Sequence, residues 1–422
     1  NLIIVVNDNE MSIAENHGGL YQNLKELRDT EGRSSCNFFR SLGLDYLYVG
    51  EGNDIPSLVA AFAKVKDTSR PTVVHIHTQK GKGYAPAEAD REEFHWEMPF
   101  DLETGKPKVD CSGMEDYHSL TGKFLLEKMK EDHTVVAISS GTPTVIGFTP
   151  ERRKQAGRQF VDVGIAEEHA VALASGIAAG GGRPVYGVYS TFIQRCYDQL
   201  SQDLCINGNP AVITVFMGTV AGMNDVTHLG FFDIPLISNI PNMVYLAPTC
   251  SEEYFAMLEW AVRQTEYPVA IRVPGVAVVH RKEEFDTDYS ELNRYKMTAR
   301  GETVAILALG SFYDLGQALK NKLREESGVE ATLINPRYIT GLDELMLEEL
   351  KVGHRIVVTL EDGVLDGGFG EKIARYYGNS EMRVLNYGLR KEFADRYNLD
   401  ELMKANRLTD KQMAEDIAGI LE

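Results

Sequence analysis

A carboxylate opens a predicted helix built almost entirely of small and aliphatic residues. Glu167 stands in Asp162-Val-Gly-Ile-Ala-Glu-Glu-His-Ala170, directly ahead of the apolar run 170–179, and Gly180-Gly-Gly182 is typical of a left-handed helix stop. Burial in apolar surroundings raises the pKa of a carboxyl group, so Glu167 is a candidate for proton exchange with a heterocycle near neutral pH. The plainer alternative is a first-turn acid favoured by the helix dipole.

Aromatic and basic side chains follow a predicted strand about twenty residues later. Val185, Gly187 and Tyr189 alternate as in a strand, and Phe192 and Arg195 come just after its end. In open α/β sheets, ligands bind at the carboxyl ends of the strands. The spacing therefore predicts a ligand pocket lined by these side chains.

A polar segment follows another apolar strand at the start of the sequence. Leu2-Ile-Ile-Val-Val6 leads into Asn7-Asp-Asn-Glu-Met-Ser12. Amide and carbonyl oxygens suit a hard cation that also holds phosphate oxygens. Taken alone, the segment is better explained as an ordinary polar turn after a strand.

Together these segments resemble the thiamine diphosphate enzymes of the transketolase group. The closest likeness is to the 1-deoxy-D-xylulose-5-phosphate synthases, whose Ile-Ala-Glu-Gln-His-Ala is matched by Ile165-Ala-Glu-Glu-His-Ala170, and it is collinear along the chain. The resemblance implies that Glu167 hydrogen-bonds the aminopyrimidine of the cofactor and stabilises the imino tautomer that removes the thiazolium C2 proton. It also implies that Phe192 stacks on the pyrimidine, and that Tyr189 and Arg195 line the same pocket.

The resemblance also implies a magnesium ion and the cofactor's diphosphate at the first segment. Asn9 and the backbone carbonyl of Met11 match the family's magnesium ligands, and Ser12 belongs to the same cofactor-binding turn. The Gly-Asp-Gly half of the family motif, which supplies a carboxylate ligand, has no counterpart here. We therefore expect either a fragment or one of two polypeptides that together form the enzyme.

Two histidines match family positions that reach the substrate. His95 keeps the family's spacing from Tyr84, which belongs to the cofactor site, and the resemblance implies that His95 reaches both substrate and cofactor. His228, in Asn224-Asp-Val-Thr-His-Leu-Gly230, matches Thr-His-x-Gly. The resemblance implies that it donates a hydrogen bond or a proton to a substrate oxygen, a role that an imidazole can switch near neutral pH.

The departures from the family fall in its substrate site. Met217 and Gly275 stand where the synthases have the arginines of Asp-Arg-Ala-Gly and Tyr-Pro-Arg-Gly, and Asn224 replaces an aspartate that the resemblance assigns to the substrate. Arginine binds phosphate or carboxylate through a bidentate fork. Losing two such pairs weakens the binding of an anionic substrate by about a hundredfold or more.

Strand-like runs alternate with amphipathic segments along the chain, which predicts an α/β fold of parallel sheets flanked by helices. The resemblance makes this a three-domain, transketolase-like architecture. Its parts are 1–112, the C-terminal part of the diphosphate-binding domain; 113–295, the pyrimidine-binding domain; and 296–422, the transketolase C-terminal domain, linked to dimerisation. The glycine-rich segment 366–370 either cradles a phosphate at a helix N-terminus or forms a tight turn.

Composition favours a soluble enzyme of the cytoplasm. The net charge of −19 opposes nonspecific nucleic-acid binding, and no apolar run approaches the roughly twenty residues of a membrane span. The cysteines are odd in number and form no CxxC pair, which suits a reducing compartment: Cys36, Cys111, Cys196, Cys205 and Cys250. His75 and His77 share one face of a strand, where they either bind zinc or have their hydrogen bonds satisfied on the face of the sheet.

Two classes of function compete. The first is a thiamine diphosphate- and magnesium-dependent transferase that moves a two-carbon unit from a 2-keto acid to an aldehyde. The family reaction joins pyruvate to glyceraldehyde 3-phosphate, a step of isoprenoid biosynthesis, and a close variant uses a less anionic acceptor. The second is a noncatalytic paralogue that serves as a binding or regulatory subunit. A nicotinamide dehydrogenase is disfavoured because no GxGxxG follows a strand. Family analogy implies a homodimer.

Overall fold

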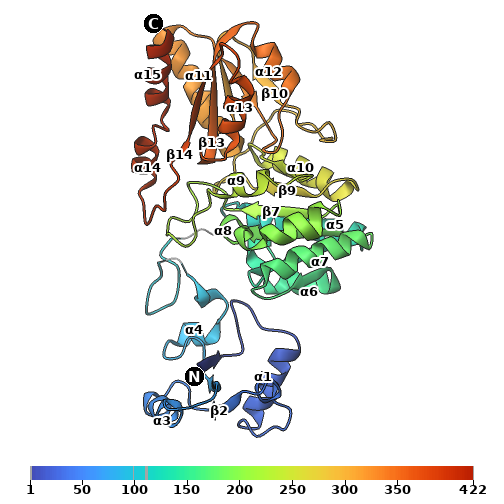
Figure 1. Cartoon of the computed structure of the whole chain (residues 1–422), viewed down its shortest axis with the longest axis vertical. Coiled ribbons are helices and arrows are strands. Elements are labelled where there is room, and N and C mark those ends of the chain that lie inside the picture. Colours follow the sequence, from blue (N-terminus) through green and yellow to red (C-terminus); the bar gives the residue numbers. More distant parts are fainter. Residues whose placement is uncertain (1, 98, 110–112, 422) are drawn as a thin grey trace. The chain divides into compact units, whose positions relative to one another are not determined.

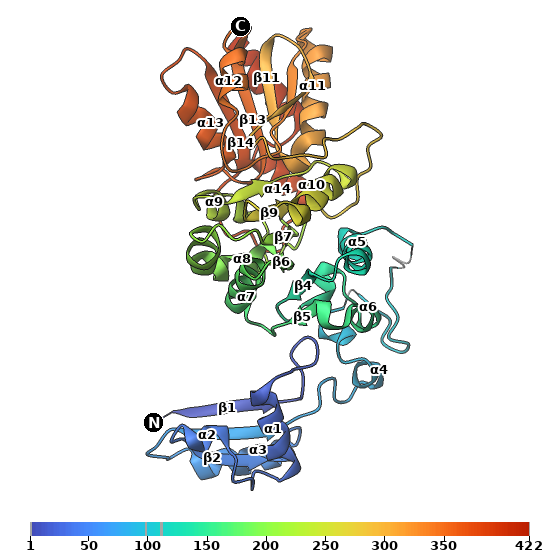
Figure 2. The same ribbon diagram turned by 90° about the vertical axis from the view of Figure 1, so that its right-hand side faces the viewer.

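The computed structural model describes residues 2–97, 99–109 and 113–421, which form two compact units, Asn1–Met114 and Glu115–Glu422. Figures 1 and 2 show them from two directions. Among the described residues, no helix combines the length and apolar character needed to cross a membrane. Cys111 lies outside the described residues, and the other four cysteines are free thiols.

The first unit is a small parallel sheet with short helices. Its strands follow the order β1-β3-β2, and Asp45–Val49 (β2) and Ile3–Asp8 (β1) flank the buried Thr72–His77 (β3). Asp54 caps α3 by accepting from the backbone N–H of Ser57. The helices are α1 (Gly19–Asp29), α2 (Phe38–Ser41), α3 (Ile55–Val65) and α4 (Ala85–Ala89), followed by a 3-10 turn at Glu93–His95.

The second unit begins with a six-stranded parallel sheet in the order β5-β4-β6-β7-β9-β8. Successive residues of its strands face opposite cores, since Tyr186 packs with α7 whereas Val185 packs with α5 and α10. The strands are β4 (Val135–Ser139), β5 (Phe160–Asp162), β6 (Arg183–Tyr189), β7 (Val212–Phe216), β8 (Val244–Leu246) and β9 (Val269–Arg272). The helices are α5 (Tyr117–Glu131), α6 (Pro150–Ala156), α7 (Glu167–Ala179), α8 (Ser190–Ile193), α9 (Asp233–Ser238) and α10 (Ser251–Arg263).

A second sheet, in the order β10-β12-β11-β13-β14, completes this unit; β10 is antiparallel and the other strands are parallel. Helices α11 and α15 lie on one face, and α12 and α13 lie on the other (Figures 1 and 2). The strands are β10 (Lys296–Ala299), β11 (Thr303–Ala308), β12 (Thr332–Asn335), β13 (His354–Val364) and β14 (Arg383–Leu389). The helices are α11 (Tyr313–Ser327), α12 (Glu344–Leu350), α13 (Phe369–Tyr377), α14 (Leu399–Ala405) and α15 (Asp410–Leu421).

The two sheets of the second unit share one hydrophobic core. The cluster that contains Ala170 and Tyr186 continues into Leu307 of the second sheet and Phe369 of α13, which packs on that sheet. A buried ion pair adds to this junction, because Arg272 bonds both carboxylate oxygens of Asp233 and also the backbone carbonyl of Asp362. The loops after β7 are therefore held between two sheets.

The predicted α/β fold with parallel sheets is confirmed. The predicted helix stop lies at Gly181, which has a left-handed φ of 83°. The glycine-rich segment 366–370 forms the turn alternative, because the carboxylate of Glu361 accepts the backbone N–H groups of Phe369 and Gly370 at 2.8 Å each. A side chain of the protein thus occupies the place that a phosphate would take at the start of α13.

Candidate functional site

Glu167 is the first residue of α7 and is 2% exposed. The helix has no side-chain cap at Ala166, and its apolar residues pack against β6. Burial raises the pKa of the Glu167 carboxyl group, although its own backbone N–H and the nearby Arg195 oppose the change. The sequence prediction of a desolvated carboxyl group at this helix start is therefore confirmed in the structure.

The carboxylate of Glu167 keeps one oxygen free of hydrogen bonds. Its Oε2 lies 3.0 Å from Nη1 of Arg195, close enough for an ion pair. The alignment is not that of a hydrogen bond, and Oε2 has no hydrogen-bond partner within the described part of the chain. Arg195 also lies 3.6 Å from Glu168, and its side chain is 43% exposed. A buried carboxyl oxygen that lacks a hydrogen-bond partner is suited to a ligand that brings a nitrogen to it.

The loop that leads to Glu167 is ordered by Asp162 at the end of β5. The carboxylate of Asp162 accepts the backbone N–H groups of Gly141 and Gly164, at 2.8 and 2.9 Å. Two strand ends, those of β4 and β5, are thereby fixed beside the start of α7. Sequence reasoning missed this role, although an acid at a strand end followed two residues later by glycine is a signal for such a turn.

Aromatic rings gather after the end of β6. The rings of Tyr189 and Phe192 lie 6.0 Å apart, and Phe192 meets the His228 ring edge-on at 5.5 Å. Tyr189 also contacts His118, which stacks on Phe216 at 4.7 Å. The structure thus brings together three of the predicted site residues, Tyr189, Phe192 and His228, at the carboxyl edge of the sheet. His118 was not among the predicted residues.

The substituted positions lie at the same edge of the sheet. Met217 follows β7 directly with a φ of 56°, and Gly275 follows β9 with a φ of 59°. The side chain of Asn224 donates to the backbone carbonyl of Tyr397 at 3.1 Å. Asn224 is therefore engaged with the segment that follows β14.

Three of the predicted residues of the first unit, Asn9, Met11 and Ser12, lie in the turn after β1. The side-chain oxygen of Asn9 accepts the backbone N–H of Met11 at 3.1 Å, and Lys80 donates to the backbone carbonyl of Ser12 at 2.7 Å. Tyr84 packs against Phe94 and Phe100. The hydroxyl group of Tyr84 is buried and has no hydrogen-bond partner among the described residues.

His95 lies in the same unit, in the 3-10 turn after α4, with an exposed side chain. Desolvation and the nearby Lys80 lower the pKa of His95. This favours the neutral imidazole, which can accept a proton.

Asp8, His75 and Arg28 form a buried network beneath this turn. The carboxylate of Asp8 bonds Nε2 of His75 at 2.9 Å and pairs with Arg28, while Tyr46 bonds the other ring nitrogen of His75 at 2.6 Å. Both ring nitrogens of His75 are thus hydrogen-bonded within the protein, and none is left for zinc. The zinc alternative is therefore wrong, and the alternative of a hydrogen-bonded histidine on the sheet is correct. No cluster of three or more His, Cys, Asp or Glu side chains suited to a metal occurs in the part of the chain that the structure describes.

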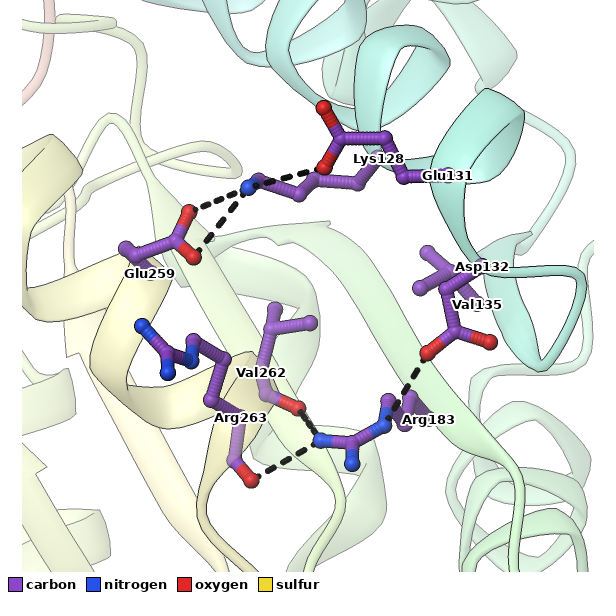
Figure 3. Close-up of a pocket in the computed structure, with 8 residues that line it drawn as sticks. All are labelled: Lys128, Glu131, Asp132, Val135, Arg183, Glu259, Val262 and Arg263. Atoms are coloured by element: carbon purple, nitrogen blue, oxygen red, sulfur yellow. Dashed lines mark hydrogen bonds and ion pairs between the residues drawn. The ribbon is translucent and has the colours of Figure 1, made fainter.

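A cleft of about 390 Å³ lies elsewhere on the second unit (Figure 3). It is lined in part by Lys128, Asp132, Arg183 and Glu259, and Val135 and Arg183 are the first residues of β4 and β6. Its main cations are paired, Lys128 with Glu259 at 2.8 Å and Arg183 with Asp132 at 3.2 Å. This cleft is at the amino edge of the sheet, opposite the edge where Glu167 lies, and its Lys128 and Arg183 are already engaged in ion pairs.

Comparison with known proteins finds matches in three parts of the chain. Family models match residues 115–278 ("Transketolase, pyrimidine binding domain"), 294–413 ("Transketolase, C-terminal domain") and 1–37 ("1-deoxy-D-xylulose-5-phosphate synthase"). A 1-deoxy-D-xylulose-5-phosphate synthase of Clostridium botulinum is 32% identical over 96% of this chain and 70% of its own length. The synthase of Alkaliphilus oremlandii is 33% identical over 99% of this chain and 72% of its own length.

Solved structures agree in fold. A split-gene transketolase, described as an inactive β4 tetramer, is similar with a TM-score of 0.60 and 22% identity, covering 73% of this chain and 98% of that chain. A transketolase of Pichia stipitis in complex with sedoheptulose 7-phosphate is similar with a TM-score of 0.58 and 15% identity, covering 99% of this chain and 71% of that chain. At these identities the structural likeness establishes the transketolase-like fold.

Proposed function

This chain belongs to the 1-deoxy-D-xylulose-5-phosphate synthase family, and we propose that it is a thiamine diphosphate-dependent transferase that joins a two-carbon unit from a 2-keto acid to an aldehyde. In the family reaction the donor is pyruvate and the acceptor is glyceraldehyde 3-phosphate. The observation that carries the proposal is the buried carboxyl group of Glu167, whose Oε2 lacks a hydrogen-bond partner among the described residues.

The residues of the second unit fit the pyrimidine part of the cofactor. Burial raises the pKa of Glu167 above that of a free carboxyl group, which favours a carboxyl group that hydrogen-bonds a ring nitrogen and exchanges a proton with it. Phe192 offers an aromatic face, and Tyr189 lies beside it. Thiamine diphosphate, when bound, supplies the nucleophilic carbon that carries the two-carbon unit.

The chain's own residues then handle protons and orientation. Arg195, which pairs with Glu167 and Glu168, holds the carboxyl group in place and moderates its basicity. His228, beside Phe192, presents its imidazole to a substrate oxygen and gives or takes a proton there. These are the roles we propose for the catalytic residues of this unit, and His95 is proposed for a similar role from the first unit.

We propose that the turn Asn9–Ser12 binds the diphosphate and a magnesium ion. The amide oxygen of Asn9 and the backbone carbonyl of Met11 are hard donors of the kind that Mg²⁺ prefers. Asp8 is not a further ligand, because Arg28 and His75 already engage its carboxylate. Tyr84 belongs to the same proposed cofactor site. We further propose that the protein is a homodimer, on family analogy, and that it lies in the cytoplasm, because of its cysteine content.

A second candidate is the same chemistry on a less anionic acceptor, and the state of Arg272 favours it. Met217 and Gly275 offer no positive charge. The arginine nearest to Gly275 in the sequence is Arg272, the last residue of β9. It is 4% exposed and is bonded to Asp233 and Asp362. Withdrawing it would leave Asp233 buried and unpaired, at a cost of about 3–5 kcal/mol. Arg272 therefore cannot replace the missing anion-binding arginines.

A turnover assay tests both candidates. The protein is incubated with thiamine diphosphate, Mg²⁺ and pyruvate, and glyceraldehyde 3-phosphate is compared with unphosphorylated glyceraldehyde as the acceptor. Preference for the phosphorylated aldehyde supports the family reaction. Preference for the neutral aldehyde supports the second candidate, and absence of turnover with any 2-keto acid argues for the noncatalytic alternative.

A further inference from the structure

The turn that carries His228 holds a carboxylate against the imidazole ring. Oδ1 of Asp225 lies 3.1 Å from Nδ1 of His228. The hydroxyl group of Thr227 lies 2.7 Å from the same ring nitrogen and donates to the same carboxylate oxygen at 2.5 Å. The backbone N–H of Thr227 also donates to this oxygen, at 3.0 Å. One oxygen of Asp225 therefore contacts the imidazole nitrogen, the Thr227 hydroxyl group and the Thr227 backbone N–H on one side of the ring.

These contacts determine which ring nitrogen carries the proton. An ionised carboxylate only accepts hydrogen bonds, and the Thr227 hydroxyl proton is already directed to it. A neutral imidazole that meets these two oxygens through Nδ1 must therefore donate from Nδ1. Nε2 then keeps its lone pair, and it has no hydrogen-bond partner within the described ranges of the chain.

Asp225 is ionised at neutral pH. Its pKa is lowered by the hydrogen bond from the Thr227 side chain, and His228 acts in the same direction. The side chains of Asp225 and His228 are 45% and 36% exposed, so small molecules can reach the ring.

The ring is fixed in position by a neighbouring helix. Phe192 of α8 meets it edge-on with an interplanar angle of 72°, and the hydroxyl group of Thr191 donates to the backbone carbonyl of Thr227 at 3.1 Å. The free Nε2 thus belongs to a ring that lies against Phe192, one of the residues proposed to hold the cofactor.

We propose that Asp225 is a positioning residue that holds His228 as its Nδ1–H tautomer, so that Nε2 can take a proton from a substrate oxygen and later return it. This inference rests on the proposed function. When Nε2 gains the proton, the ring becomes an imidazolium and its Nδ1–H stays on the carboxylate, which stabilises the positive charge. The same division of labour between a carboxylate and an imidazole operates in hydrolytic triads.

A matched control lies on the other side of the same turn. Oδ1 of Asp395 accepts the backbone N–H of Val226 at 3.1 Å, and the backbone N–H of Arg396 donates to the carbonyl of Asn224 at 2.6 Å. Asp395 is thus a second carboxylate that fixes this turn without bonding the imidazole. Asp395→Ala reports the effect of loosening the turn, and Asp225→Ala adds the loss of the tautomer.

The test combines two measurements on the full chain. Nitrogen-15 NMR of the imidazole, recorded without substrate, reports the tautomer. The pH dependence of kcat with the best donor and acceptor reports proton transfer. We expect Nδ1–H in the parent protein and a mixture of tautomers in Asp225→Ala. In that variant, kcat falls about tenfold to a hundredfold with little change in KM, and the acid limb of the profile moves to lower pH by about half a unit to one unit. Asp225→Asn, which keeps an acceptor oxygen, retains the tautomer but shows the shifted acid limb.

Two results overturn the inference. One is an unchanged tautomer and pH profile in Asp225→Ala. The other is an equal loss of kcat with the same shift of the profile in Asp395→Ala, which would mean that only the shape of the turn matters. Should the parent protein turn over no donor and acceptor, the proposed function fails, and the NMR comparison of Asp225→Ala with Asp395→Ala still decides the tautomer.

Discussion

Replacing Glu167 with glutamine isolates proton exchange from packing. Glutamine has nearly the same volume and keeps an oxygen that can face Arg195, which lies 3.0 Å from Oε2 and is 43% exposed. The substitution therefore removes the titrating proton and the negative charge while the start of α7 remains filled. Because Arg195 reaches solvent and still lies 3.6 Å from Glu168, losing the charge of Glu167 costs the ion pair little stability.

The expected loss of activity follows from the role of the carboxyl group. A positioned general acid or base contributes about 10²–10⁴-fold to a rate, which corresponds to about 3–5 kcal/mol of activation free energy. Glu167→Gln should therefore lower kcat by at least a hundredfold. The affinity for thiamine diphosphate, measured by fluorescence titration, should change much less, since the aromatic and diphosphate contacts remain.

Stability gives a second readout with a defined sign. Burial raises the pKa of Glu167 in the folded state, so the stability that this group contributes is present at low pH and is lost as the pH rises through the folded pKa. The glutamine variant does not titrate. Its melting temperature relative to the parent protein should therefore increase as the pH rises above the ordinary pKa of a glutamate.

The neighbouring Glu168 provides the control. It contacts the same arginine at 3.6 Å, but its side chain is 42% exposed. Glu168→Gln should keep most of the turnover. The reasoning is refuted if Glu167→Gln retains turnover within about threefold of the parent protein, or if Glu168→Gln loses as much activity as Glu167→Gln.

Three further substitutions test other parts of the molecule. Met217→Arg should raise kcat/KM for glyceraldehyde 3-phosphate relative to glyceraldehyde by about tenfold or more, and an unchanged ratio would show that this position does not set the preference. Glu361→Ala leaves the backbone N–H groups of Phe369 and Gly370 without an acceptor. It should lower the free energy of unfolding, measured by urea denaturation, by about 1–3 kcal/mol. Burial raises the pKa of Glu361 to about 7, so the parent protein loses stability as the pH rises through 7. The difference in unfolding free energy between the parent protein and Glu361→Ala should therefore become smaller with rising pH. A difference that becomes larger would contradict the role given to Glu361. Asp8→Asn should weaken the first unit by about 2 kcal/mol at neutral pH, because hydrogen bonds from His75 and Arg28 hold the pKa of Asp8 at about 2 against the opposing effect of burial. Hydrogen exchange in β3 should show this difference disappear as the pH falls towards 2, and a difference that persists there would refute it.

The sequence predicted the elements that periodicity governs. The strand around Val185 and the helix after Glu167 follow from apolar patterning and glycine punctuation, and both occur in the structure as β6 and α7. The partners of long-range contacts were not predictable in this way. Glu361 fills the start of α13 from an adjacent strand, and nothing in its local sequence distinguishes it from an ordinary strand acid.

The candidate site shows the same division. Glu167, Phe192 and His228 were predicted because motifs fix residue type and spacing, and the structure places Phe192 and His228 in contact. Asp225 was missed because its function depends on the conformation of a turn rather than on a motif. An acid three residues before a histidine is common, and only the turn geometry shows that both side chains meet.

The C-terminal sheet also holds the loop from Met217 to His228, which we propose contacts the substrate, a role beyond the dimerisation expected for that domain. Asp362 accepts the backbone N–H of Val220 at 2.7 Å, and the Tyr397 hydroxyl group donates to the carbonyl of the same residue at 2.6 Å. The loop from Met217 to His228 is thus bonded at several points to residues more than a hundred positions later in the chain. We therefore expect changes in the C-terminal domain to alter which acceptor is used, without affecting the proton exchange proposed for Glu167 at the start of α7. On this reasoning acceptor preference and catalytic competence should be separable, and the substitutions at Met217 and Glu167 probe them independently.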